Sequence, residues 1–351
     1  MPTGNILYLA PAFLADRRHK TIRGVQVFDL LFVRDLVKLG HNVTLVGEAN
    51  WRPRFEEHLA GARPTILYTP PLRKPLPCML WASLALRGRF DATHLGNPAM
   101  GLLPGLSILA RRGMLGKLTI QANKAPSERF ANWVDKWSPI YAALSQEVCT
   151  LSPPSIRDKM HVYYGIVNPE EVHPPPTPLP PEPVNFILVG KLDNLWKGAP
   201  EAIDAWSRLD PAVRKRCRLH LVSYPNPPAN LPEGVIAHPW RPASDIPPLL
   251  RQMHVILVPS TNNQETFSQA MVQGMLTALP IIVNDLPVLT EKLDAGGGLI
   301  SRSNEQLAQH ITTLANDPAL RQSMGQAGRA VALQRYIWDS KTFVNRFLLR
   351  A

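Results

Sequence analysis

A glycine and two lysines stand between an apolar segment and a helical pattern in the second half of the chain. Gly190 and Lys191 directly follow the apolar segment, and Lys197 and Gly198 precede Pro200, which is typical of a first helical turn. Backbone amides at a helix start, together with ammonium groups, form a favourable site for a phosphate or diphosphate. The pattern therefore predicts an anion site at the end of a strand. The alternative is that both lysines are ordinary solvated surface charges.

A second polar patch follows further along the same half. Glu265 ends a loop, and Gln273 comes eight positions later. We place a helix near Thr266–Leu276, so eight positions correspond to about two turns and both side chains project toward one side. One polar group would then stand at the helix entrance and the other along its face. The alternatives are a carboxylate that caps the helix and an ordinary surface glutamine.

At these residues the chain resembles the retaining glycosyltransferases of the GT-B fold, family four (glycosyl transferases group 1). The family's first pattern is G-R-x-x-x-x-x-K-G, and the residues that match it are Gly190, Lys191, Lys197 and Gly198. The second is E-G-F-G-x-x-x-x-E-A-M-A-x-G-x-P, and the residues that match it are Glu265, Phe267, Gln273, Met275 and Pro280. Weaker matches elsewhere in the chain keep the family's order: Phe90–His94, Tyr163–Val167 with Pro169 and Val172, and Trp338.

The resemblance implies a nucleoside-diphosphate sugar as co-substrate, a hydroxyl acceptor, no cofactor and no metal. Lys191 and Lys197 would neutralise the diphosphate as the sugar leaves it. Glu265 would accept hydrogen bonds from the donor sugar, and Gln273 would hold the ribose. Transfer would retain the anomeric configuration, and no protein nucleophile is nominated. The implied donor-binding residues are Gly24, Gly190, Lys191, Lys197, Glu265, Thr266, Phe267, Ser268 and Gln273.

The N-terminal half is expected to hold the acceptor. Gly24 resembles the family's glycine loop at a helix start, and its alternative is a simple helix-entry glycine. His94 joins Lys191, Lys197 and Glu265 as a catalytic candidate, because it is expected to end a strand and face the cleft. Asn123 is a second acceptor-side candidate. Their alternatives are a satisfied buried histidine and a turn residue at a strand end.

The chain departs from the family pattern at several of these positions. Lys191 replaces an arginine and loses its bidentate fork, while Gln273 replaces a glutamate and loses the charge. Asn123 replaces a histidine, and Ser268 and Ala278 replace glycines. Two other functions therefore stay open: a sugar-nucleotide-binding protein without catalysis, and another enzyme of the same fold, such as an epimerase or a phosphorylase.

The elements that must position these residues alternate between strands and helices in both halves of the chain. Apolar runs predict strands at the following residues: Ile6–Ala10, Val43–Val46, Thr65–Tyr68, Asp91–Leu95, Leu118–Gln121, Val148–Ser152, Asn185–Val189, Leu219–Ser223, Val255–Pro259 and Ile281–Asn284. Such alternation is typical of parallel sheets covered by helices. The predicted fold class is α/β: GT-B, with two Rossmann-like doubly wound domains facing a central cleft.

A proline-rich segment divides the chain in this prediction. Residues 173–183 contain seven prolines and form neither helix nor central strand, so we predict a stiff linker. Residues 1–172 then form the acceptor-binding domain and residues 184–330 the nucleotide-sugar-binding domain. Residues 331–351 are predicted to form a helix that packs back on the N-terminal domain.

The composition limits the class of partner. The 351 residues carry a formal net charge of +11, which favours phosphate-bearing substrates or an anionic membrane surface. Basic clusters such as Arg17–Lys20 and Arg111–Arg112 lack interleaved aromatic residues, so nucleic acid is not expected. Without a secretory signal or a membrane-length apolar run, we expect a cytoplasmic protein, with peripheral contact to the inner face of the membrane as a second hypothesis. Residues 99–110 are either a core helix or a membrane-docking helix.

Overall fold

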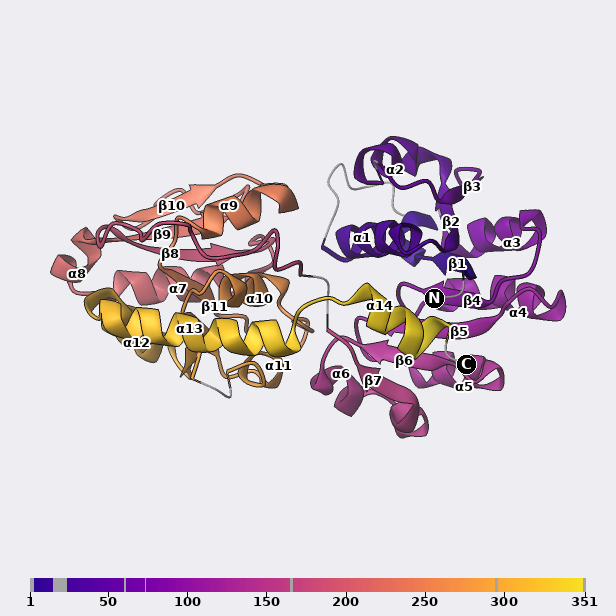
Figure 1. The fold of residues 1–351 in the computed structure, drawn as a ribbon. Helices are drawn as coiled ribbons and strands as arrows, with labels where there is room; N and C mark the ends of the chain where they lie inside the picture. Colours follow the sequence, from indigo (N-terminus) through magenta and orange to yellow (C-terminus); the bar gives the residue numbers. More distant parts are fainter. Residues whose placement is uncertain are drawn as a thin grey trace. The chain divides into compact units, whose positions relative to one another are not determined.

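The computed structural model describes residues 3–14, 24–59, 61–72, 74–164, 167–293 and 296–349. The chain divides into two compact units, and in Figure 1 the first is coloured indigo to magenta, with the yellow C-terminal segment, and the second magenta to yellow. The first unit comprises Met1–Ile166 together with Asp339–Ala351, and the second comprises Val167–Trp338. The final residues of the chain therefore belong to the N-terminal unit, whereas residues 331–335 continue the last long helix of the second unit.

The proline-rich segment does not connect the two units, so the linker predicted at residues 173–183 is wrong. The division falls earlier, between Ile166 and Val167, and the segment lies within the second unit. The His254 ring nitrogen Nε2 lies 2.9 Å from the carbonyl oxygen of Pro180, and the guanidinium of Arg216 donates to Glu182 at 3.0 Å. Proline keeps the segment irregular, but these polar contacts hold it on the domain surface.

The N-terminal unit is a doubly wound parallel sheet. In the described residues its strand order is β3-β2-β1-β4-β5-β6-β7. The strands are β1 (Asn5–Leu9), β2 (Asn42–Glu48), β3 (Thr65–Thr69), β4 (Ala92–Leu95), β5 (Lys117–Ala122), β6 (Ile140–Ala143) and β7 (Met160–Val162). The helices are α1 (Gly24–Lys38), α2 (Arg52–His58), α3 (Pro75–Ala85), α4 (Leu103–Arg111), α5 (Glu128–Val134), α6 (Gln146–Leu151) and α14 (Ser340–Phe343).

The two faces of this sheet are covered by different helices. On one face Leu7, Leu95 and Ile120 join a buried cluster with residues of α3, α4 and α5. On the other face Phe32 of α1 and Phe343 of α14 make an edge contact, with ring centroids 4.8 Å apart. Figure 1 shows the yellow C-terminal segment lying against this unit. The C-terminal residues are therefore part of the N-terminal core.

The second unit repeats this architecture. In the described residues its strand order is β10-β9-β8-β11-β12-β13, with every pair parallel. The strands are β8 (Val184–Val189), β9 (Cys217–Val222), β10 (Val235–His238), β11 (Val255–Val258), β12 (Ile281–Asn284) and β13 (Gly298–Ser301). The helices are α7 (Ala199–Ser207), α8 (Pro211–Lys215), α9 (Ile246–Leu250), α10 (Gln269–Leu276), α11 (Pro287–Thr290), α12 (Asn304–Asn316) and α13 (Pro318–Arg335).

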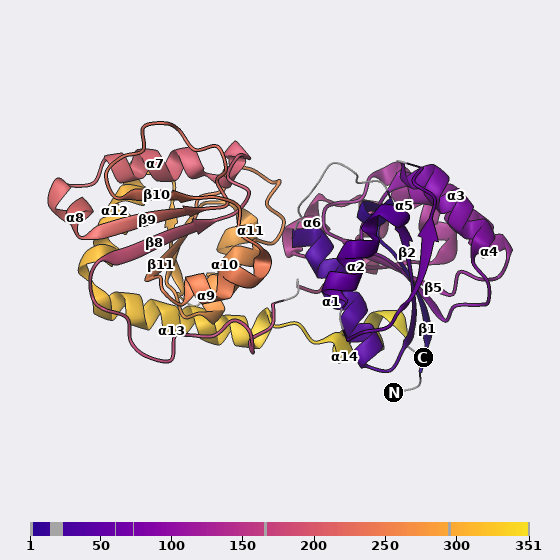
Figure 2. The ribbon, with the colours of Figure 1, turned by 90° about the horizontal axis from the view of Figure 1, so that it is seen from above.

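Helices cover both faces of the second sheet as well, as Figure 2 shows from above. Phe186, Leu219 and Leu257 pack with α7 and α12 in one buried cluster. On the opposite face α10 approaches β11 so closely that a Cβ on Gly274 would lie 2.7 Å from Ile256 Cγ2. The predicted α/β class with two Rossmann-like parallel-sheet domains is confirmed.

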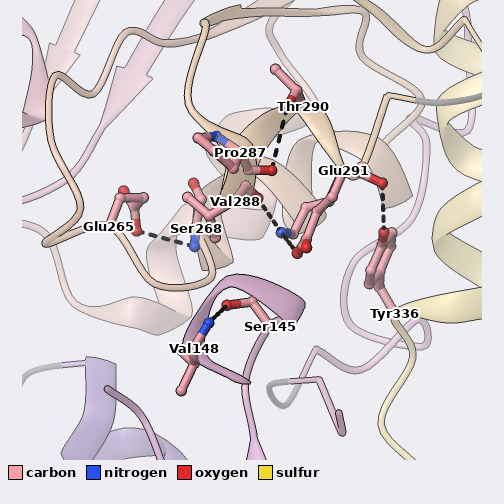
Figure 3. Close-up of polar contacts among 10 residues, drawn as sticks. Ser145, Val148, Glu265, Ser268, Pro287, Val288, Thr290, Glu291 and Tyr336 are labelled. Carbon is pink, nitrogen blue, oxygen red and sulfur yellow. Dashed lines mark hydrogen bonds and ion pairs between the residues drawn. The ribbon is translucent and has the colours of Figure 1, made fainter. Parts of the chain in front are cut away.

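Most predicted strands are present, but the one at Val148–Ser152 is wrong. Residues 146–151 form α6 instead, because the hydroxyl of Ser145 accepts a hydrogen bond from the backbone amide of Val148 and caps a helix there (Figure 3). The neighbouring strand is β6, at Ile140–Ala143. Among the described residues, no helix has both the length and the apolar content to cross a membrane.

Candidate functional site

Two loops of the second unit leave neighbouring strands at the same edge of the sheet. All strands are parallel, and β8 pairs with β9 on one side and with β11 on the other. The strands before β11 are therefore added toward one edge of the sheet, and those from β11 on are added toward the other. In doubly wound sheets this switch point is where ligands bind, at the carboxyl ends of the strands. The loop after β8 carries Gly190 to Gly198, and the loop after β11 carries Pro259 to Ser268.

The first loop brings Lys197 to this edge. Leu195–Lys197 form a short 3-10 turn, and Gly198 ends it with a φ of +83°, a conformation that favours glycine. Gly198 also lies against the second loop, since a Cβ placed on it would be 2.0 Å from the carbonyl oxygen of Pro259. A Cβ on Gly190 would be 3.5 Å from Lys197 Cδ, so the lysine stem crosses this glycine.

The second loop places Glu265 against Lys197. The Lys197 ammonium Nζ and Glu265 Oε2 are 2.6 Å apart, and the side chains are 21% and 7% exposed, respectively. The hydroxyl of Ser260 donates to the same oxygen at 3.2 Å, and the backbone amide of Ser268 donates to Oε1 at 3.1 Å. Figure 3 shows the contact between Glu265 and Ser268. Both carboxylate oxygens are thus held in one orientation.

The helix after this loop starts later than predicted. α10 begins at Gln269, so residues 265–268 remain loop and Ser268 adopts a left-handed conformation with a φ of +59°. The half-buried Gln273 therefore stands little more than one turn into the helix, and the predicted two-turn relationship with Glu265 is wrong. The backbone amide of Ser268, one of the implied donor-binding residues, donates to Glu265.

A buried lysine that the sequence patterns did not indicate supports this loop. Lys292 is 1% exposed, and its ammonium donates to the carbonyl oxygen of Val288 at 2.5 Å and to Glu291 Oε1 at 2.9 Å. The same ammonium lies 5.3 Å from the ring centroid of Phe267 and 5.7 Å from that of Tyr336. Figure 3 shows Val288, Glu291 and Tyr336 beside the Glu265 loop. In the sequence, the only sign of Lys292 is that it and Glu291 form a charged pair within the mainly apolar run of residues 286–293.

The remaining predicted donor residues lie around this centre. Phe267 is buried, Thr266 is half-buried and Lys191 is exposed. In the described part of the chain, the partners of the Glu265 carboxylate include Lys197, Ser260 and Ser268 but not Lys191. The structure therefore brings Lys197, Glu265, Gly190 and Ser268 together and leaves Lys191 at the surface.

His94 does not occupy the position that the sequence predicted for it. Its side chain is fully buried on β4, with ring centroids 5.0 Å from those of Tyr8 and Phe32 and 5.7 Å from that of Phe343. Burial lowers its pKa to about 3, so the ring is neutral at physiological pH. A histidine enclosed by three aromatic rings cannot touch a substrate, and the expectation of a cleft-facing catalytic His94 is wrong. The physical reason is that α14 covers this face of the sheet.

The other acceptor-side candidates lie at strand ends and a helix start. Asn123 follows β5 and is largely buried, and its side-chain amide donates to the carbonyl oxygen of Gly96 at 3.0 Å. Gly24 is the first residue of α1. The residues directly before it, including the basic cluster Arg17–Lys20, lie outside the described part of the chain. Within that part, no group of three or more His, Cys, Asp or Glu side chains is arranged to hold a metal ion.

Comparisons with known proteins agree with this architecture. A family model described as Glycosyl transferases group 1 matches residues 183–317, which include both loops of the site. No curated protein sequence matches the chain.

Among solved structures, Anabaena HepE in complex with UDP and glucose is 16% identical, with a TM-score of 0.71, over 97% of this chain and 96% of that chain. A glycosyltransferase from Rickettsia africae is 15% identical, with a TM-score of 0.73, over 96% and 95% of the two chains. Sucrose-phosphate synthase from Thermosynechococcus elongatus is 15% identical, with a TM-score of 0.69, over 96% of each chain. At these identities the likeness establishes the fold, which is GT-B. The second unit therefore matches the glycosyl transferases group 1, and the chain as a whole has the GT-B fold.

Proposed function

We propose that this protein transfers a sugar from a nucleoside-diphosphate sugar to a hydroxyl acceptor. The observation that carries the proposal is the Lys197–Glu265 pair at the switch point of the second sheet. An ammonium group there can stabilise the negative charge that develops on a departing diphosphate. A nearby carboxylate, held by Ser260 and Ser268, can accept hydrogen bonds from sugar hydroxyls.

The proposed reaction retains the anomeric configuration and uses no metal. The bond between the anomeric carbon and the phosphate oxygen breaks, and the acceptor oxygen forms the new bond on the same face of the sugar. The acceptor proton passes to the departing phosphate oxygen, so no protein nucleophile is required. Lys197 supplies the charge stabilisation that a divalent cation supplies in other transferases. The group 1 family match over both loops supports this assignment.

UDP-glucose is the first donor to test, because HepE of Anabaena, which shares this fold, was solved with UDP and glucose. The experiment is a thermal-shift screen of the full chain with UDP-, GDP- and ADP-sugars, followed by turnover with candidate hydroxyl acceptors in the presence of EDTA. A ligand at about 100 times its Kd stabilises the folded state by about 2.7 kcal/mol, which is readily detected. Product anomers assigned by NMR test retention.

The screen also separates the open alternatives. Stabilisation by a nucleotide sugar without turnover would assign the chain as a binding protein. A changed sugar without an acceptor would indicate an epimerase, and a requirement for phosphate would indicate a phosphorylase. If no nucleotide sugar stabilises the chain, or if Lys197→Ala leaves the affinity unchanged, the proposed donor site is wrong.

A further inference from the structure

Exposed apolar side chains gather on one helix of the N-terminal unit. α3 contains no charged residue, and its inner face is buried through Cys78, Met79, Ala82 and Ser83. Its outer face nevertheless exposes Leu76, Trp81 and Leu84. A helix that is apolar on both faces is expected inside a core or at a membrane, not in water.

Two further apolar residues extend this face at the start of α3. Leu72 precedes the helix, and Met100 stands beside its first turn, because a Cβ on the adjacent Gly101 would lie 3.2 Å from Pro75 Cβ. We name the set Leu72, Leu76, Trp81, Leu84 and Met100 the α3 face. These side chains are 36% to 64% exposed, with Leu84 the most exposed. An apolar patch of this kind marks an interaction surface.

The charge near the α3 face is mainly positive. Residues 70–90 contain four lysines or arginines, residues 96–118 contain three, and neither segment contains an aspartate or glutamate; Asp91, between them, accepts a hydrogen bond from the backbone amide of Asn5. Lys74 and Arg89 flank α3 and are exposed, and Arg111 is exposed at the end of α4. Figures 1 and 2 both show α4 lying beside α3. An apolar face with a basic rim matches the chemistry of an anionic membrane surface.

Two of these basic residues also have a structural role. Arg87 donates to the carbonyl oxygens of Ala85 and Leu86 at 3.1 and 3.0 Å, and Arg112 donates to that of Leu86 at 3.2 Å. Both guanidinium groups therefore satisfy carbonyls at the C-terminal end of α3. Arg87 and Arg112 remain charged while these hydrogen bonds fix the end of α3. The basic side chains and the apolar face of α3 are therefore held in a constant relative position.

We propose that the α3 face docks on the surface of an anionic lipid bilayer, with Trp81 and Leu84 inserted and the basic rim on the lipid phosphates. A tryptophan at this depth places its apolar ring and its N–H where each is favourable. A second copy of the chain fits the face poorly, because a two-fold contact would set the same basic rim against itself. This inference does not rest on the proposed transfer reaction.

The buried face of α4 decides between the two alternatives for residues 99–110, a core helix or a membrane-docking helix. Leu103, Leu106 and Leu109 are fully buried in the core of the N-terminal unit. The core alternative therefore holds for α4. Its contribution to the docking surface is the exposed Arg111 at its end.

The test is co-sedimentation of the full chain with vesicles of phosphatidylcholine alone and of phosphatidylcholine with phosphatidylglycerol. We expect binding to the anionic vesicles that weakens at high salt, since the Debye length shrinks. The double variant Lys74→Gln/Arg111→Gln should bind about 30-fold more weakly at low salt, and Arg129→Gln, an exposed arginine elsewhere in the same unit, should bind normally.

Apolar variants test insertion directly. Leu84→Gln should weaken vesicle binding by about 10-fold or more, while Leu333→Gln, on the exposed side of α13, should not. Trp81→Phe should still bind but lose fluorescence quenching by lipids brominated near the headgroup. Because these side chains are exposed, the thermal midpoints should match the wild type. Equal binding by Leu84→Gln, equal binding to neutral vesicles, or dimers that dissociate in Leu84→Gln would each overturn the proposal.

Discussion

The ammonium group of Lys197 lies 2.6 Å from a carboxylate oxygen of Glu265, across two loops that leave adjacent strands. The cation that we propose for the donor diphosphate is thus already paired with a carboxylate in the free protein. The pairing holds both side chains in place before a ligand binds, which lowers the ordering cost of binding. In the proposed donor complex, each residue would therefore modify how the other contacts the donor.

Glu265→Gln should therefore separate the two roles. The amide preserves the shape of the carboxylate but removes its charge, so Lys197 becomes more available to phosphate. We expect affinity for free UDP to stay equal or to rise, while turnover of the sugar donor falls by roughly 10- to 100-fold, as expected for loss of a charged hydrogen bond. Isothermal titration with UDP and steady-state kinetics measure the two effects.

The matched variant is Lys197→Met, which keeps an unbranched stem across Gly190 and removes the ammonium. It should weaken UDP binding by roughly 10-fold or more, the opposite direction from Glu265→Gln. If both variants lose UDP affinity to the same extent, the pair acts as one structural unit, and the division of roles between phosphate and sugar is wrong.

Ser268 and Ala278 occupy left-handed backbone positions, with φ values of +59° and +61°. At both positions the family pattern has glycine. In this conformation a Cβ strains the folded state by about 1–2 kcal/mol. Glycine removes that strain, but its greater conformational freedom stabilises the unfolded state by about 0.4–1 kcal/mol. Ala278→Gly should therefore stabilise the protein by roughly 0.5–1 kcal/mol and raise its thermal midpoint by about 1–4 °C.

The control for this substitution is Ala330→Gly, at an exposed position inside α13. The same chemical change in an ordinary helical conformation should destabilise the protein by about 1 kcal/mol. Calorimetry of the two variants gives shifts of opposite sign if the left-handed backbone is the cause. A thermal midpoint of Ala278→Gly below that of the wild type would contradict the claim that the backbone is strained at this position.

The strand pattern and the two loops of the second unit could be predicted because they depend on local signals. Apolar runs such as Ile281–Asn284, typical of buried strands, alternate with segments whose apolar residues have helical spacing. Gly198 and Pro200 indicate a turn before a helix. Glu265 and Lys197 could be placed at one sheet edge because parallel strands share their carboxyl ends. The family pattern then added chemical roles that the local signals do not carry.

The errors arose where distant segments decide the outcome. His94 carries no local sign that Phe343, from the end of the chain, will cover it. Lys292 follows an apolar run like a surface residue, and only the folded chain shows its ammonium enclosed by Phe267 and Tyr336. The α6 error differs in kind, because Ser145 was a readable N-cap that the apolar composition of the segment outweighed.

Lys292 should influence donor binding through Phe267 without touching the donor itself. Its ammonium lies over the Phe267 ring, in the loop between Glu265 and Ser268. A desolvated contact of this kind contributes on the order of 1–2 kcal/mol. We expect Lys292→Met to raise the KM for the sugar donor by roughly 5- to 30-fold with a smaller change in kcat.

Tyr336→Phe is the matched variant for that experiment. It keeps the second ring near the ammonium and removes only a hydroxyl that lies 3.5 Å from the carbonyl oxygen of Glu291. Donor KM should be close to that of the wild type. Equal KM values for Lys292→Met and the wild type would show that the loop holds its shape without the buried cation.

His94 and Asp29, two buried titratable residues of the N-terminal unit, should change the stability of the protein in opposite directions as pH rises. Burial lowers the pKa of His94 to about 3, so its contribution is present above the ordinary pKa of about 6.5 and is lost as pH falls toward 3. Burial raises the pKa of Asp29 to about 8, although a hydrogen bond from the Tyr8 hydroxyl acts in the opposite direction. The contribution of Asp29 is therefore present below about pH 4 and is lost as pH rises toward 8.

Single substitutions should each remove one of these slopes. In the described part of the chain neither ring nitrogen of His94 has a hydrogen-bond partner, so His94→Leu loses no bond and should flatten the fall in thermal midpoint between about pH 6.5 and 4. Asp29→Asn keeps an acceptor for Tyr8, 2.7 Å away, and should flatten the fall between about pH 5 and 8. Because His94 is enclosed by aromatic rings, His94→Leu should also retain sugar transfer at pH 7.5. Loss of transfer by a folded His94→Leu variant would restore His94 as a catalytic residue.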